Sequence, residues 1–228
     1  MDNKTYEYVE DRSMTIQQYI NNIFKWMVIG VLTTFVTAFA LEKSSFMSYA
    51  GMLPFILIIF QFAVVIRLSR HLMTMKPATA KALYITYSVI TGITFSYVIS
   101  SYTGFTVSLA FLVAAIYFGV LVILGTVVKM DLTRIGTLCL TGLFVYLIFA
   151  IIVMIFNLPV GSLIMPLISL ALFAGITAYD MQKSLQLYHR ASSNKEMLEK
   201  ISIYGAFNLY LDFMNIFLDI LQLLGDNN

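Results

Sequence analysis

The chain has 228 residues and a mass of 25.7 kDa, and 60% of its residues are hydrophobic while only 11% are charged. An ordinary soluble domain has about 25% charged residues, and a globule of this size has too little interior to hide so much apolar surface. The mean hydropathy is +0.86. The composition therefore excludes a soluble enzyme and predicts a protein whose solvent is lipid. A net charge of +2 gives no reason to expect nucleic acid as a partner.

Seven apolar runs approach the length of about 20 residues that a helix needs to cross a bilayer. In chain order they are Ile23–Leu41, Met52–Leu68, Ala80–Ser100, Phe105–Val128, Arg134–Phe156, Leu163–Tyr179 and Ile203–Leu224. Gly and Pro mark the short connections between them, and no run shows the period of two expected of a barrel strand. We predict an all-α, polytopic membrane protein with seven transmembrane helices. Residues 23–228 are expected to form one domain, preceded by a cytoplasmic tail over residues 1–22.

The positive charges predict the orientation of these helices. When the connections are assigned alternately to the two sides of the membrane, 13 of the 14 Lys and Arg residues fall on one side and only Lys43 falls on the other. Cytoplasmic connections carry the excess of Lys and Arg in membrane proteins. We therefore expect a cytoplasmic N-terminus and a C-terminus on the outside.

Metal and cysteine chemistry is not indicated. Cys139 is the single cysteine, which excludes an internal disulfide and a cysteine-based zinc site. His71 and His189 lie at the ends of apolar runs and do not have the spacing of metal ligands. We expect no cofactor and no enzymatic activity.

The seventh run differs from a simple anchor because it carries polar side chains along one face. At 100° per residue, its six polar positions fall within a stripe about 80° wide. They are Tyr204, Asn208, Asp212, Asn215, Asp219 and Gln222. An acidic residue at the centre of a bilayer costs about 2.5–3.5 kcal/mol on insertion scales. Two interpretations remain open: the side chains hold neighbouring helices together, or they line a hydrated path for ions.

Other charged residues lie at the ends of the second and sixth runs. Asp180 directly follows the sixth run, where it could pair with Lys183 or Lys200 or face the polar stripe. Arg67 lies deeper in the second run than Arg70. Both arginines could serve as anchors at the membrane surface, and either could be a cationic partner for a carboxylate.

Three strings in the sequence resemble motifs of the Bax inhibitor-1 family, and of its bacterial branch in particular. They are NLYLDFMNIFLDILQLLG in the last run, AGITAYDMQK at the end of the sixth and MKPATAKALYITYSVITGITFS around the third. The resemblance extends over nearly all of the chain from the first run onward. It implies a seven-helix fold with the last helix at the centre, in a bacterial inner membrane.

The resemblance also implies a pH-sensitive calcium leak. In the family, a pair of aspartates on the last two helices senses pH, and an arginine on the second helix latches to the pair. Carried over by motif, the pair is Asp180 and Asp212, and the latch is Arg67 or Arg70, of which we favour Arg67 for its depth. Asp219 departs from the family pattern, which has an apolar or neutral residue at this position.

Elementary electrostatics gives such a pair a mechanism. Two neighbouring carboxylates in a low-dielectric setting do not both ionise freely, and they titrate as a unit. Loss of a shared proton would separate the helices or admit a cation. Asp180 and Asp212 could then form a weak calcium site with amide oxygens and water.

Two other functions stand as alternatives to the leak. The protein could be a regulator without transport activity that binds a membrane protease or another integral membrane protein. An intramembrane aspartyl protease also uses aspartates on two helices, but here Leu211 and Phe213 flank Asp212 in place of a Gly-rich context. We therefore favour the leak over the regulator, and both over proteolysis.

Overall fold

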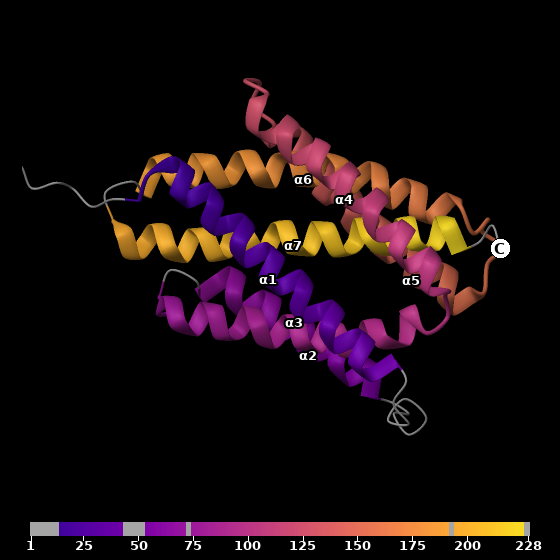
Figure 1. Cartoon of the computed structure of the whole chain (residues 1–228). Helices are drawn as coiled ribbons and strands as arrows, with labels where there is room; N and C mark the ends of the chain where they lie inside the picture. Colours follow the sequence, from indigo (N-terminus) through magenta and orange to yellow (C-terminus); the bar gives the residue numbers. More distant parts are fainter. Residues whose placement is uncertain (1–13, 43–52, 72–73, 192–193, 226–228) are drawn as a thin grey trace, which may run out of the picture.

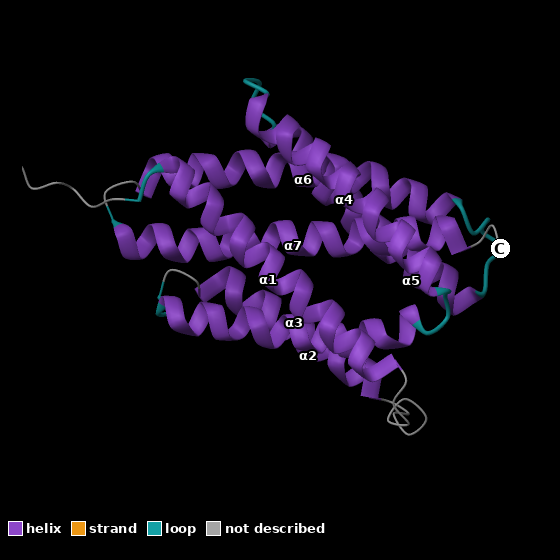
Figure 2. Ribbon diagram, viewed as in Figure 1, coloured by secondary structure: helices purple, strands orange, loops and turns teal. Residues whose placement is uncertain are grey.

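The computed structural model describes residues 14–42, 53–71, 74–191 and 194–225. These residues form seven α-helices, in agreement with the sequence prediction (Figures 1 and 2). In chain order they are α1 Ile16–Glu42, α2 Leu53–His71, α3 Pro77–Ile99, α4 Gly104–Val127, α5 Thr133–Phe156, α6 Ile164–Ala191 and α7 Lys195–Gly225. All of these helices except α2 meet the criteria of length and apolar composition for a membrane span. The chain is a polytopic helical membrane protein.

Three helices extend by more than one turn beyond the apolar runs that predict them. Helix α1 begins at Ile16, because Thr15 and Gln18 cap its first turn reciprocally through their side chains and backbone N–H groups. Helix α6 continues to Ala191, and α7 begins at Lys195. The 31 residues of α7 span about 46 Å, against about 30 Å of hydrocarbon. The charged first turns of α7 therefore project out of the membrane.

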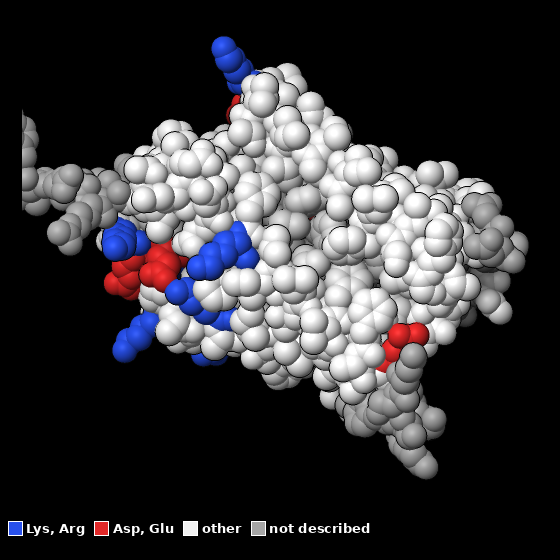
Figure 3. All heavy atoms as spheres, viewed as in Figure 1, with Lys and Arg blue, Asp and Glu red and all other residues white. Residues whose placement is uncertain are grey.

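Most of the charged side chains visible in Figure 3 lie toward the left of the bundle, some lie on the projection at the top, and an acidic group lies at the lower right. Every described Lys and Arg lies in the first part of α1 or in and beside the α2–α3, α4–α5 and α6–α7 connections. Two ion pairs stabilise this end, Lys81 with Glu199 and Lys200 with Glu196. The structure thus places alternate connections at the same end, as the charge distribution predicts. The remaining residues of the predicted tail, 1–13, and Lys43 lie outside the described residues.

Helix α7 is the most buried helix of the described part. Its main partners are α1, α3, α4 and α6, while α2 packs against α3 and α5 packs against α6. The last helix is therefore central, but its principal contacts involve four of the other helices rather than six. Helices α2 and α5 form an outer layer, and α5 buries only Gly136.

Hydrogen bonds and aromatic rings join the inner helices. The hydroxyl groups of Thr34 on α1 and Tyr210 on α7 lie 2.7 Å apart, and both residues are fully buried. Phe207 and Tyr210 make edge-to-face contacts with Tyr84 on α3. Lipid offers no hydrogen bonds and little hydrophobic driving force between helices, so polar pairs and close packing hold such helices together.

Glycine permits a close approach between α4 and α6. A methyl group at Gly125 would overlap the backbone carbonyl of Ala178, whereas one at Gly119 on the same helix would meet no atom within 4 Å. The close contact at Gly125 therefore depends on the absence of a side chain. Gly119 has no such role, although its place in an apolar run suggests one.

We expect Gly125→Ala to lower the thermal midpoint of the detergent-solubilised protein, because overpacking against backbone costs about 1–3 kcal/mol. Gly119→Ala is the matched control on the same helix. It should leave the midpoint unchanged or raise it, since Ala favours a helix over Gly by up to about 1 kcal/mol. Equal midpoints for the two variants would contradict this account of the α4–α6 contact.

Candidate functional site

A cavity of about 780 Å³ lies among α2, α3, α5, α6 and α7. All six polar positions of the α7 stripe line it, and Asp180 and Lys183 join them from α6. The seven-residue separation of Asp212 and Asp219 corresponds to about 10.5 Å along α7. The polar stripe therefore faces an open space inside the protein, next to the less tightly packed α2 and α5.

Asp180 on α6 and Asp212 on α7 line the same cavity. The two carboxyl groups interact electrostatically. Asp212 is only 3% exposed, and its Oδ2 atom has no hydrogen-bond partner within the described residues. Thr177, one turn before Asp180 on α6, also interacts with the Asp212 carboxyl group. The structure therefore brings the two aspartates of the predicted pair together at the wall of the cavity.

Close packing of α6 on α7 holds this pair in place. Ser184 donates a hydrogen bond to the backbone carbonyl of Asp180 at 2.8 Å. The Ser184 carbonyl in turn accepts a bond from the Tyr19 hydroxyl of α1 at 3.0 Å. A side chain at Gly205 would press on Ser184. The position of Asp180 thus depends on contacts from both α1 and α7.

The cation beside Asp180 is Lys183. It lies one turn further along α6 and interacts electrostatically with the Asp180 carboxyl group. Lys200, the other candidate from the sequence, pairs with Glu196 at 2.8 Å. Of the two lysines that the sequence offers, the structure therefore assigns Lys183 to Asp180.

The two candidate latch arginines do not reach the aspartate pair in this structure. Arg67 and Arg70 are exposed on the last turns of α2 and form no ion pair within the described residues. Helix α2 contributes Gln61, Phe62 and Val65 to the cavity instead. A latch through either arginine stays a prediction.

A second group of polar side chains lies further along the cavity, around Asp219. The Ser169 hydroxyl of α6 interacts both with the Asp219 carboxyl group and with Tyr146 of α5. Ser169 is buried, and the Oδ2 atom of Asp219 has no hydrogen-bond partner within the described residues. The sequence analysis missed Ser169 and Tyr146. A signal for Ser169 exists, because it precedes Asp180 by 11 residues, or three turns plus about 20°, and so shares its face of α6.

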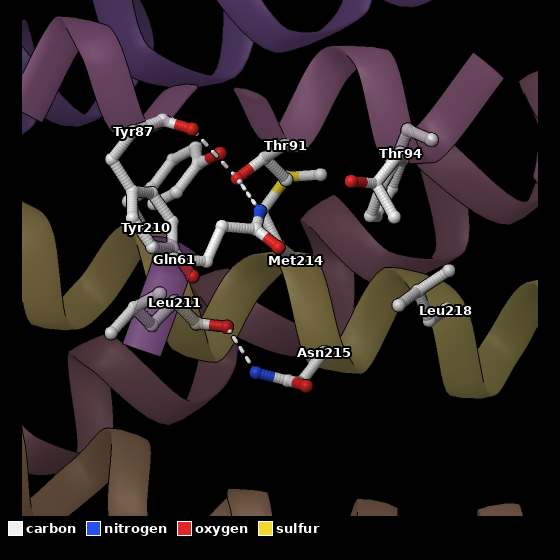
Figure 4. A pocket seen from close by; sticks show the side chains of 10 residues that line it. Gln61, Tyr87, Thr91, Thr94, Tyr210, Leu211, Met214, Asn215 and Leu218 are labelled. Atoms are coloured by element: carbon white, nitrogen blue, oxygen red, sulfur yellow. Dashed lines mark hydrogen bonds between the residues drawn. The ribbon is translucent and has the colours of Figure 1, made fainter. Parts of the chain in front are cut away.

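A smaller cavity of about 180 Å³ adjoins the first, between α2, α3 and α7 (Figure 4). Gln61 of α2 donates a hydrogen bond to the Thr91 hydroxyl of α3 at 2.8 Å. Asn215 donates to the backbone carbonyl of Leu211 at 2.7 Å and lines both cavities. The amide of Asn215 therefore continues the polar surface from one cavity into the other.

The ligands available suit a weakly held cation. Among the described residues, no group of three or more His, Cys, Asp and Glu side chains lies together. Calcium takes six to eight oxygen ligands, which carboxylates, amides and water can supply. Asp180 and Asp212 with Asn208 offer too few for a tight site.

Comparison with known proteins agrees with the motifs. Residues 16–228 match the family described as "Inhibitor of apoptosis-promoting Bax1". The chain belongs to the Bax inhibitor family. An uncharacterized protein of Deinococcus radiodurans is 35% identical over 214 residues, covering 91% of this chain and 90% of its own length. The inner membrane protein YbhL of Escherichia coli K12 is 34% identical over 223 residues, covering 92% of each. The resemblance seen in the sequence is thereby confirmed.

We expect a cysteine placed at Asn215 to react with a water-soluble thiol reagent in a Cys139→Ser background, because Asn215 lines the cavity. Phe217→Cys on the same helix should stay unreactive, since Phe217 is fully buried. Labelling is measured by mass shift in intact vesicles. Equal labelling of the two positions would contradict the prediction that the polar stripe is accessible to water and the packed face is not.

Proposed function

We propose that this protein is a pH-sensitive leak pathway for calcium. The observation that carries the proposal is the meeting of Asp180 and Asp212 at the wall of a cavity lined by the polar stripe of α7. Buried polar groups that only joined helices would be expected to have partners. The Oδ2 atoms of Asp212 and Asp219 have none among the described residues, which favours an ion path over structural hydrogen bonding.

The pair can control the path because two neighbouring carboxylates in a low-dielectric setting do not both ionise freely. With one proton shared, α6 and α7 are held together at this point. Loss of the proton leaves two negative charges. These charges repel each other or together attract a cation. The contact is thus a bistable element biased by protonation.

The charge distribution and the family both support the proposed location. We propose that the charged end of the bundle faces the cytoplasm, because cytoplasmic connections carry the excess of Lys and Arg. The relative YbhL is an inner membrane protein, and the inner membrane is the location we propose for this protein. The C-terminal end of α7 would then face the outside.

The test is calcium flux into liposomes that contain only the purified protein, measured between about pH 5 and pH 8. We expect a flux that changes with pH in the wild type. In Asp180→Asn and in Asp212→Asn, the pH dependence should be lost, because the remaining carboxylate has no partner with which to share a proton. Retained pH dependence in both variants would rule out the pair as the sensor.

Asp131→Asn is the matched control for removal of a carboxylate. Asp131 is exposed in the α4–α5 connection, where the Thr133 side chain and backbone N–H donate to its Oδ1 at 2.6 and 2.9 Å. The hydrogen bond from the Thr133 side chain, followed by that from its backbone, lowers the pKa of Asp131 from its ordinary value. A lowered pKa keeps this carboxylate ionised throughout the range tested, so its removal should leave the pH profile unchanged.

A regulator that binds another membrane protein is the second candidate. The observation that favours it is α5, which buries only Gly136 and presents the apolar side chains of Leu138, Phe144 and Val145 outward. Absence of flux at every pH from well-folded protein would favour this function. A flux from the purified protein in liposomes that contain no other protein would favour the leak.

A further inference from the structure

The cavity has an apolar wall opposite its polar stripe. Helix α2 contributes Phe62 and Val65 to this wall, and α5 contributes Leu140, Leu143 and Leu147. Phe62 and Leu147 are 61% and 47% exposed. In the membrane, such exposed side chains contact lipid acyl chains. The cavity is therefore bordered between α2 and α5 by residues that also face lipid.

The opposite wall carries an excess of negative groups. Asp180, Asp212 and Asp219 line the cavity, and Lys183 is the one cationic side chain among the described lining residues. Because Lys183 interacts with Asp180, the positive charge lies at the end of the cavity that is away from Asp219. A ligand that matched both walls would have an apolar body and a positive charge.

Asp219 is the carboxylate best placed to receive that charge. Asp219 lines the cavity and forms no ion pair within the described part of the chain, and its Oδ2 atom is buried there without a hydrogen-bond partner. Ser169 and Tyr146 lie beside it from α6 and α5. A carboxylate and two hydroxyl groups from three helices can accept several hydrogen bonds from one ammonium group.

We propose that this cavity binds a monocationic amphiphile, with its ammonium group at Asp219 and its apolar chain along α2 and α5. A volume of about 780 Å³ lies in the range of about 300–1,000 Å³ typical of ligand sites, which combine apolar walls with a few placed polar groups. This site goes beyond calcium transport and does not depend on it, since a protein that conducts no ions could still bind an amine.

The experiment compares three probes on the full-length protein in nanodiscs of zwitterionic lipid, with empty nanodiscs subtracted. Each probe joins a dansyl fluorophore to an eight-carbon chain that ends in a primary amine, a hydroxyl or a carboxylate. We expect the amine probe to bind saturably at neutral pH and to increase in fluorescence. The carboxylate probe should not bind, because three aspartates line the cavity.

Variants locate the site. Asp219→Asn should weaken binding of the amine probe roughly tenfold or more, the size of effect typical of a charge-assisted hydrogen bond. Leu143→Trp, which fills the cavity from α5, should abolish binding. Asp131→Asn, which removes an exposed carboxylate elsewhere, should bind as the wild type does.

Two outcomes would overturn the proposal. Equal binding of the three probes would show an apolar cavity without selection for charge, as expected of a site for lipid acyl chains. Amine binding that is unchanged in both Asp219→Asn and Leu143→Trp would place the probe elsewhere. The comparison of the three probes uses the wild type alone, so it decides the question even if a variant fails to fold.

Discussion

The structure depends on the high free-energy cost of exposing polar groups to lipid. Lipid cannot hydrogen-bond to a carboxylate or a backbone carbonyl. Helix α7 places two aspartates and four other polar side chains in the interior of the bundle. The helices around it are therefore arranged so that α1, α3, α4 and α6 pack closely on its apolar faces while the polar face looks into a cavity. The central position of α7 and the existence of the cavity both follow from this constraint.

The closely packed part of the bundle is separate from the cavity. The α4–α6 contact at Gly125 and the Thr34–Tyr210 hydrogen bond belong to the closely packed part. Helices α2 and α5 belong to the outer layer and provide the apolar wall of the cavity. A change in the position of either outer helix would alter the cavity without breaking the main contacts of α7.

Sequence patterns predicted the helices and the polar stripe because hydropathy and a period of 3.6 residues depend only on local order. The helix ends were less predictable, since a capping pair such as Thr15 and Gln18 extends a helix beyond its apolar run. The proximity of Asp180 to Asp212 came from the family motifs, because spacing within one helix does not determine which side chains meet between two helices. Ser169 and Tyr146 were missed because a single Ser or Tyr in an apolar run is most often structural.

The order of the helices in the chain also bears on how the protein is made. The carboxylates of α7 raise the free energy of inserting an isolated helix by about 2.5–3.5 kcal/mol each at the bilayer centre. Helix α7 follows the six other helices in the chain, so the surfaces of α1, α3, α4 and α6 are synthesised before it leaves the ribosome. Its polar face can then move directly into the protein interior without exposure to lipid. The packing of α7 against the earlier helices would therefore offset the free-energy cost of inserting its polar face.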